Sequence, residues 1–461
     1  MNNKLLLATD NEGMTALHLA AWKGNLHILV KVREWAEEKL TTQEINNKLL
    51  LATDNEGMTA LYVAAGKGKL DILLNLWYWV EEKLTTEEIH NKLLLATDNK
   101  GITFLHAAAW KGNIDILLKV GEWAKEKLTA EDINNKLLLA TDKEGMTALH
   151  VAATADNPDV LLKLWEWAQE KLTREEINNK LLLAKDNEGR TALHVAATAG
   201  NSDVLLKLWE WAQEKLTTEE INNKLLLAKD NEGRTALHVA ASEGKLLLMQ
   251  KLWELAEEKL TKEEINNNML LAADNEGKTA WHGAACKGKL DVLQKLWEWA
   301  EEKLTTEDVC NEVLLATDNN GRTAWHEAAY LGKLDIMQKL LEWAEMKFAR
   351  EEINKNLLLA TDKEGRTALH EAAYGRKLDT LYKLWDWAKE KLATEDIINK
   401  FLLATDNKGN TAWHVAAYQG YIDIMQNVRE WAEGKLSTEE INNKLILPTD
   451  NDGKRAWHEE A

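Results

Sequence analysis

The chain has 461 residues, a formal net charge of −19, 45% hydrophobic residues and 29% charged residues. This composition is too apolar for a disordered tail and too charged for a membrane protein, and no uncharged apolar run is long enough to span a bilayer. The acidity argues against nucleic acid as a main partner, because phosphate contacts need clustered Lys and Arg. Solubility alone accounts for the negative charge, and a basic partner is the functional alternative.

Signals of secretion and of an oxidising compartment are missing from the sequence. The first residues lack the apolar core and small-residue cleavage site of a signal peptide. Two cysteines, Cys286 and Cys310, cannot build a disulfide framework and form no C-x-x-C pair. We therefore expect a cytoplasmic protein without a cofactor, in which both cysteines act as small buried hydrophobic residues.

The dominant feature of the sequence is an internal repeat. An aspartate that precedes a turn glycine recurs every 44 residues without one insertion or deletion, at Asp10, Asp54, Asp98, Asp142, Asp186, Asp230, Asp274, Asp318, Asp362, Asp406 and Asp450. Self-similarity at a fixed period is typical of solenoids. It predicts a single domain over residues 1–461, with ten complete repeats from Asp10 to Thr449 and partial repeats at both ends.

Each repeat begins with a recognisable motif, which reads DNEGRTALHVAA at residues 186–197. This motif resembles that of the ankyrin repeat, D-x-x-G-x-T-P-L-H-x-A-A, and comparable blocks cover essentially the whole chain. Two features depart from the family pattern. The family's proline is alanine, or Phe104 in one repeat, and the period is 44 residues where the family has 33. The resemblance implies an all-α, ankyrin-like α-solenoid with short finger, or hairpin, turns.

The first two helices of a repeat follow from local rules. In the fifth repeat, Thr191 is expected to cap a short helix that stops at Gly200. A second helix is expected to start near Ser202 and to run to Leu216, because its apolar residues keep a spacing of three or four.

A third, short helix accounts for the residues in excess of the family's length. Thr217 and Glu220 have the spacing of a capping box, which marks a new helix start. The sequence therefore predicts three helices in each 44-residue repeat. Ala349 and Ala393 replace the capping Thr in two repeats, and each should weaken its helix start by ~1 kcal/mol.

Most histidines occupy one position of the repeat, for example His18, His106, His194, His282 and His370. A regular row of histidines suggests metal binding, but neighbouring repeats would separate the side chains by ~10 Å. Zinc ligands lie ~2 Å from the metal, so one ion cannot bridge the row, and we expect no metal site. The resemblance implies a structural histidine that hydrogen-bonds the finger backbone, and Tyr62 at the same position favours a packing role.

Nineteen of the 21 tryptophans fall into three sets. Nine share the position of Trp211 and are expected in the core between repeats. Six lie two residues earlier, like Trp209, and either cover the third helix or are partly exposed. Four replace the leucine of the motif and should be buried: Trp281, Trp325, Trp413 and Trp457.

No catalytic motif is present: the chain has neither a G-x-S-x-G nucleophile elbow nor a phosphate-binding G-x-x-x-x-G-K-[ST] loop. In a solenoid, shared positions build the core and differing positions are free to specify a partner. The repeats differ most after the turn glycine and at the end of the first helix. By resemblance these positions line a concave binding surface. The candidate partner-binding residues are Met14, Trp22, Lys23, Met58, Lys67, Trp110, Lys111, Arg190, Arg234, Lys278, Arg322, Tyr330, Arg366, Tyr374 and Tyr418.

These residues change character along the chain. The first repeats offer Met and Trp, the middle ones Arg, and later ones Tyr with the acidic Glu327 and Glu371. Aromatic and Arg residues are the usual anchors of interfaces, although drift among recently duplicated repeats also explains the variation.

The resulting hypothesis is a non-catalytic scaffold for protein–protein interaction that presents a concave binding surface, with no membrane or nucleic-acid partner. The alternative is a structural, self-assembling protein that stacks end to end into homo-oligomers or filaments through uncapped ends. A third hypothesis, the targeting part of an effector or toxin, has no residue that supports it.

Overall fold

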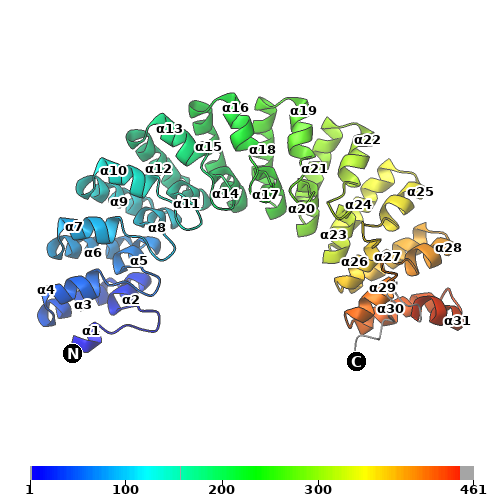
Figure 1. Ribbon diagram of the computed structural model, residues 1–461, viewed down its shortest axis with the longest axis horizontal. Helices are drawn as coiled ribbons and strands as arrows, with labels where there is room; N and C mark the ends of the chain where they lie inside the picture. Colours follow the sequence, from blue (N-terminus) through cyan, green and yellow to red (C-terminus); the bar gives the residue numbers. More distant parts are fainter. Residues whose placement is uncertain (1–2, 156, 447–461) are drawn as a thin grey trace. The chain divides into compact units, whose positions relative to one another are not determined.

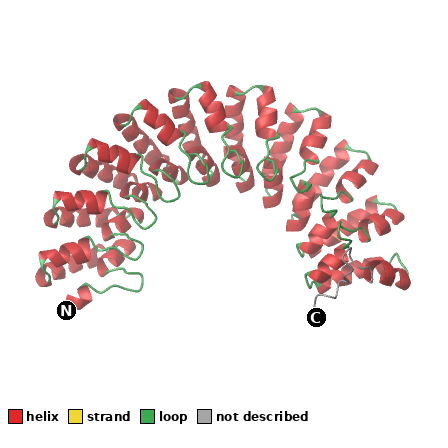
Figure 2. Cartoon of the chain, in the orientation of Figure 1, coloured by secondary structure: helices red, strands yellow, loops and turns green. Residues whose placement is uncertain are grey.

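The computed structural model describes residues 3–155 and 157–446, and this part of the chain is all-α. The chain divides into two compact units, an N-terminal unit of residues 1–231 and a C-terminal unit of residues 232–461. Each unit repeats a group of three helices, and the finger turns lie beside the first helix of each group (Figures 1 and 2). The predicted all-α, ankyrin-like solenoid with three helices per repeat is confirmed. Thr449 and Trp457, which entered the sequence predictions, lie outside the described residues.

The N-terminal unit begins with the short helix α1 (Asn3–Leu6). Its first helices are α2 (Ala16–Lys23), α5 (Ala60–Gly66), α8 (Phe104–Trp110), α11 (Ala148–Thr154) and α14 (Ala192–Ala199). Its second helices are α3 (Leu26–Lys39), α6 (Leu70–Lys83), α9 (Ile114–Lys127), α12 (Pro158–Lys171) and α15 (Ser202–Lys215). Its third helices start as α4 (Thr42–Ile45), α7 (Thr86–Ile89), α10 (Ala130–Asp132), α13 (Arg174–Ile177) and α16 (Thr218–Glu220). They continue as the π-helical segments η1 (Asn46–Leu50), η2 (His90–Leu94), η3 (Ile133–Leu138), η4 (Asn178–Leu182) and η5 (Ile221–Leu226).

The C-terminal unit follows the same plan. Its first helices are α17 (Ala236–Glu243), α20 (Ala280–Lys287), α23 (Ala324–Leu331), α26 (Ala368–Tyr374) and α29 (Ala412–Tyr418). Its second helices are α18 (Leu246–Lys259), α21 (Leu290–Lys303), α24 (Leu334–Lys347), α27 (Leu378–Lys391) and α30 (Ile422–Glu433). Its third helices start as α19 (Lys262–Ile265), α22 (Thr306–Asp308), α25 (Arg350–Ile353), α28 (Thr394–Asp396) and α31 (Thr438–Ile441). They continue as η6 (Asn266–Leu270), η7 (Val309–Leu314), η8 (Asn354–Leu358), η9 (Ile397–Leu402) and η10 (Asn442–Ile446).

The histidine of the motif closes a capping box at the start of each first helix. The backbone N–H of Thr15 donates to Nδ1 of His18 at 3.3 Å, and since an N–H can only donate, Nδ1 accepts. Nε2 therefore carries the proton and donates to the carbonyl of Met58 in the next finger at 2.9 Å. His106 binds the carbonyl of Met146 in the same way. The predicted structural role of this histidine is confirmed, and Tyr62 keeps it by donating its hydroxyl to the carbonyl of Ile102 at 3.1 Å.

The tryptophans stack between consecutive second helices. Trp77 of one repeat lies on Trp123 of the next, with ring centroids 3.9 Å apart, and Trp165 lies on Trp211 at 4.2 Å. The six earlier tryptophans, which left two possibilities open in the sequence, are all buried. Trp281, Trp325 and Trp413 are buried as predicted. Trp35 was expected in the core but is 37% exposed, because in the described residues no second helix precedes α3 to cover it.

Each third helix starts with α-helical and ends with π-helical hydrogen bonding. In the fifth repeat the Oγ1 of Thr217 accepts the N–H of Glu220 at 3.2 Å, which confirms the capping box. In η1 the N–H of Leu51 then bonds the carbonyl of Asn46 at 2.8 Å, five residues back. The side chain of Asn46 donates to the last carbonyl of the next second helix, that of Lys83, at 3.0 Å. The third helix thus adds its own contact between repeats.

The fingers bind one another through a repeated pair of hydrogen bonds. The backbone N–H of Asn55 donates to the carbonyl of Glu12, and its side chain donates to the carbonyl of Asn11. Gly13 turns the finger with a φ of 77°, and a Cβ there would meet the Asn55 amide group at 2.6 Å. The turn glycine is therefore required both by the backbone conformation and by the close approach of the next finger.

Candidate functional site

The finger face is the surface made by the residue after each turn glycine and the residues that close each first helix. All fifteen candidate residues lie on it, and none of them is buried. Trp110 and Tyr418 are the most open aromatic residues among them, at 61% and 70% exposure. Within each unit the fingers and the first helices of consecutive repeats touch, so these residues come together in rows.

In the N-terminal unit the finger face is hollowed into a groove of about 480 Å³. Met58, Ile102 and Met146 line it from the fingers, and Trp22 and Trp110 line it from the ends of α2 and α8. The groove therefore offers a mostly apolar surface with aromatic side chains, which is the usual lining of a site that binds a ligand or a partner's side chains.

Two lysines border this groove. The Nζ of Lys67 lies 3.3 Å from the centre of the Trp22 ring, a cation–π contact. Lys100 forms an ion pair with Glu56 at 3.4 Å. Lys23 and Lys111 are exposed beside Trp22 and Trp110. Both lysines of the groove are thus already engaged by groups of the chain.

Two finger aspartates, Asp98 and Asp142, also line the groove. The Oδ1 of Asp98 accepts the N–H of Lys100 and of Ile102 at 2.8 and 2.9 Å, and that of Asp142 accepts the N–H of Met146 at 2.8 Å. In the part of the chain that the structure describes, neither aspartate forms an ion pair with a basic side chain. Burial raises the pKa of Asp142, against the backbone N–H groups that lower it.

The fifth repeat shows what a basic residue does at the same place. Arg190 stands where Met146 stands one repeat earlier, and its Nε lies 2.8 Å from the Oδ2 of Asp186. The Asp186 side chain is fully covered, at 0% exposure, and the whole residue is as buried as Asp142, at 6% exposure each. A guanidinium therefore fits the outer oxygen of a finger aspartate when the residue after the turn glycine supplies it.

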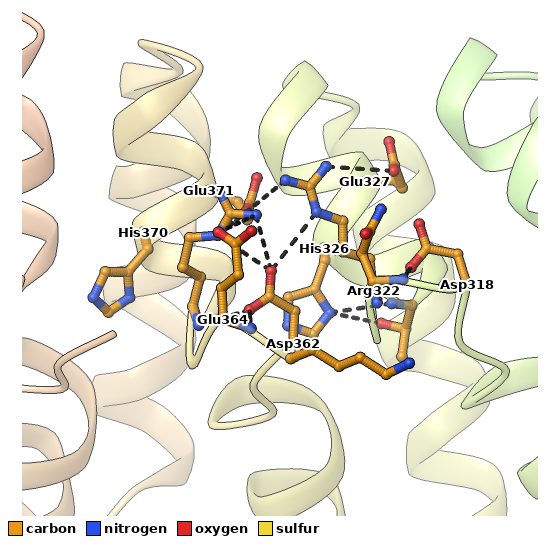
Figure 3. Close-up of polar contacts among 12 residues, drawn as sticks. Asp318, Arg322, His326, Glu327, Asp362, Glu364, His370 and Glu371 are labelled. Carbon is orange, nitrogen blue, oxygen red and sulfur yellow. Dashed lines mark hydrogen bonds and ion pairs between the residues drawn. The ribbon is translucent and has the colours of Figure 1, made fainter. Parts of the chain in front are cut away.

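In the C-terminal unit the finger face carries a network of buried charges (Figure 3). Nη2 of Arg322 lies 3.3 Å from Glu371, and its Nη1 lies 3.7 Å from Glu327. Nε of Arg366 lies 3.1 Å from Glu371, and its Nη2 lies 3.1 Å from Asp362. Sequence reasoning placed Glu327 and Glu371 on the surface, but they are only 5% and 1% exposed. The Arg side chains of the neighbouring fingers cover them.

The network is not fully satisfied. Oε2 of Glu371, Oδ2 of Asp318 and Nε of Arg322 are buried without a hydrogen-bond partner among the described residues. Burial raises the pKa of Glu371, while Arg322 and Arg366 act in the opposite direction. Arg322 and Arg366 are therefore held by buried carboxylates.

The other predicted residues of this unit are placed around the network. Lys278 pairs with Glu327 at 3.5 Å, and Arg234 pairs with Glu232 at 2.8 Å. The rings of Tyr330 and Tyr374 lie 5.9 Å apart. Tyr374 is 44% exposed, so aromatic side chains remain open to solvent beside the buried charges.

Few side chains in the described ranges are placed for metal binding or covalent chemistry. No group of three or more His, Cys, Asp or Glu side chains in residues 3–155 and 157–446 is placed to hold a metal ion. Both cysteines are free, and Cys310 is buried as expected, but Cys286 is only half-buried. Burial, followed by the nearby Glu327, raises the pKa of the Cys286 thiol. The same residues contain no helix that is both long and apolar enough to cross a membrane.

A second apolar surface lies on the first repeat of the N-terminal unit. Leu19, Ile28 and Trp35 are 40%, 45% and 37% exposed. Their equivalents in the second repeat, Val63, Ile72 and Trp79, are buried. We call the exposed set the α3 face.

Fold and finger geometry together define a helical-repeat protein whose repeats are joined through their fingers. A family model described as ankyrin repeats in three copies matches residues 122–218, 176–262 and 306–391. The chain belongs to the ankyrin repeat family. Ankyrin repeats are in general modules for protein–protein interaction. No curated protein matches the chain.

Sequence reasoning missed Asp98 and Asp142 as part of the candidate site. The predicted binding residues occupy positions that differ between repeats, whereas Asp98 and Asp142 occupy the position that all repeats share. The signal lay in the residue four positions later, which is Arg beside Asp186 but Ile or Met beside Asp98 and Asp142. All of these aspartates and Asp362 are buried, but of the four only Asp186 and Asp362 are paired with the arginine of their own finger.

Proposed function

We propose that the chain is a non-catalytic scaffold that binds protein partners on its finger face. One observation carries this proposal: the groove of the N-terminal unit, in which Met58, Ile102 and Met146 meet the exposed Trp22 and Trp110. Large aromatic residues near a recess are typical anchors of protein interfaces. The finger face also supplies Tyr374 and Tyr418 in the C-terminal unit, both exposed.

The charge of the finger face favours a basic partner. Four carboxylates line the groove, from Glu56, Asp98, Asp142 and Glu144, against the two lysines Lys67 and Lys100. Complementary charge raises association rates and excludes wrong partners. We therefore expect binding to weaken as the salt concentration rises.

The test compares the wild-type chain with variants that remove aromatic side chains on and off the finger face. Trp22→Ala with Trp110→Ala removes the two groove anchors, and Tyr78→Ala removes a 65% exposed aromatic residue on the second helix α6 as a control. Proteins captured by the wild type and identified by mass spectrometry are then purified and titrated. Partners retained by Tyr78→Ala but weakened about tenfold or more by the double variant support the proposal. Equal affinity for all three chains contradicts it.

The α3 face favours a second candidate, self-assembly. In the second repeat the equivalent residues are covered by the repeat before it, so the natural cover for this surface is another repeat of the same kind. A second copy of the chain would supply one. Light scattering over a range of concentrations tests this: growth in mass that Ile28→Asp abolishes supports assembly, and a constant monomer mass rejects it.

A further inference from the structure

We propose that the groove of the N-terminal unit recognises a protein segment in which an arginine neighbours a large apolar residue, and that this arginine binds Asp98 or Asp142. The inference rests on the proposed function and deepens it by naming the chemistry of the partner. It also assigns a binding role to two aspartates that are shared structural residues of the repeat.

The two aspartates offer a carboxylate oxygen that the chain itself leaves without a basic side chain. Oδ1 of each is used by backbone N–H groups of its own finger. Both carboxyl groups line the groove, with Tyr62 within reach of their charge. Burial, and then the negative charge of Asp98 and Asp142, raises the pKa of the Tyr62 hydroxyl. Both carboxylates thus line one groove, although Asp98 and Asp142 are only 8% and 6% exposed.

The chain carries its own template for the bound arginine. At Asp186 the guanidinium of Arg190 occupies the outer oxygen at 2.8 Å, and at Asp362 the guanidinium of Arg366 does so at 3.1 Å. Ile102 and Met146 replace those arginines in the groove. The place of the guanidinium is thereby left to a residue from another molecule.

The surroundings select arginine over lysine and over a bare cation. A guanidinium is planar, weakly hydrated and able to lie on aromatic rings, whereas an ammonium is a compact and strongly hydrated charge. The groove combines the carboxylates with Trp110, Met58 and Met146, which suits a planar cation and an apolar neighbour. Trp22 already holds a cation, Lys67, on its ring, so this apolar surface tolerates positive charge.

The experiment uses the full chain and peptides selected from a random twelve-residue phage-displayed library. We expect the selected peptides to contain Arg next to Leu, Phe or Trp. Each synthetic peptide is titrated by fluorescence anisotropy beside a copy in which citrulline, a neutral analogue of the same shape, replaces the Arg. Charge-assisted hydrogen bonds are strong, so the citrulline copy should bind about tenfold or more weakly.

Two variants at Met146 test whether the arginine of the peptide binds Asp142. Met146→Arg supplies the chain's own guanidinium to Asp142, as Arg190 does for Asp186, and we expect it to weaken the peptide at least several-fold. Met146→Gln removes the same apolar contact without a charge and should change the affinity much less. Since Arg occupies the equivalent position in the next repeat, Met146→Arg should fold, and an unchanged circular dichroism spectrum checks this.

The outcomes separate the two proposals. Peptides that lose binding in Trp22→Ala with Trp110→Ala, yet bind equally as citrulline copies and to Met146→Arg, overturn the arginine inference and leave the proposed function intact. Peptides that bind the double tryptophan variant as tightly as the wild type contradict the proposed function of this groove. The inference is supported if peptide affinity falls both when citrulline replaces the arginine and in Met146→Arg, but not in Met146→Gln.

Discussion

The two units use the same position of the finger face in opposite ways. In the N-terminal unit the residue after the turn glycine is Met or Ile in four repeats, and the shared aspartates Asp98 and Asp142 face an open groove. In the C-terminal unit it is Arg or Lys in four repeats and Asn410 in the fifth, and Arg322 and Arg366 pair with carboxylates buried in the same unit. Asp98 and Asp142 thus line a groove without a basic partner of their own among the described residues. The buried carboxylates Glu327 and Glu371 are instead paired with basic side chains of their unit.

The difference shows that a repeat can change its surface without changing its fold. The residue after the motif histidine makes the same point, because it is apolar in all five repeats of the N-terminal unit but Glu327 and Glu371 in two repeats of the C-terminal unit. Buried ion pairs add little net stability, since desolvation offsets their attraction. Differences at these two positions thus accompany the change from an apolar recess to a network of buried charges.

Lowering the pH should reduce the free energy of unfolding more than any other change, and it should do so in both units. Burial lowers the pKa of His18, His106 and His150 in the N-terminal unit and of His282, His326 and His370 in the C-terminal unit. Below the unfolded pKa of about 6.5 the unfolded chain binds more protons than the folded chain, so stability falls with pH down to the folded pKa. The slope is about 1.4 kcal/mol per pH unit for each histidine. The three histidines of either structural unit together give about 4 kcal/mol per pH unit.

Urea unfolding at pH 7.5 and pH 5.5 measures this slope. His106→Tyr is the control, because Tyr62 already makes the equivalent hydrogen bond at 3.1 Å without a group that titrates in this range. It should reduce the pH dependence. An unfolding midpoint that is the same at both pH values would refute the assigned role of the histidine row.

Removing one charge from the buried network should cause the next largest loss of stability, and this loss should be confined to the C-terminal unit. Arg322→Met leaves Glu371 with Arg366 and Glu327 with Lys278 at 3.5 Å. Removing one member of a buried ion pair costs about 3 kcal/mol or more, so thermal unfolding should begin at a lower temperature. The triple variant Arg322→Met, Glu327→Val and Glu371→Val recreates the N-terminal pattern and should recover most of the loss. A triple variant as unstable as Arg322→Met would show that the carboxylates are not the cause.

The smallest effect concerns the third helices, where the units differ in capping. Those of the N-terminal unit begin after a Thr that accepts a backbone hydrogen bond, as Thr217 does, whereas Ala349 and Ala393 leave two in the C-terminal unit without one. Ala393→Thr should stabilise the chain by about 1 kcal/mol, and Thr305→Ala should destabilise it by a similar amount. Hydrogen exchange of α28 and α22 locates the change. Opposite signs are required, so a loss from Ala393→Thr would count against the capping argument.

Sequence patterns predicted the fold in detail because its rules are local. Thr217 with Glu220 marks a helix start, and the shared histidine follows from its motif. The π-helical end of the third helix was not predicted, since it depends on Asn46 reaching the next second helix at Lys83. The burial of Glu327 and Glu371 was missed for a similar reason: it depends in part on Lys278 and Arg322, which reach them from the preceding repeat. What the sequence did not reveal lies in contacts between repeats.

In several consecutive repeats the fingers are joined by the same side-chain hydrogen bond. Asn55, Asn99, Asn187 and Asn231 each donate a side-chain hydrogen bond to the residue 44 positions earlier. Each such repeat carries both complementary edges of the same joint, so a copied or deleted 44-residue block would still meet a matching neighbour. Growth and shrinkage of the gene by whole repeats then requires no compensating mutation. Chain length, and with it the number of side chains offered to partners, becomes a heritable quantity that recombination can change in a single event.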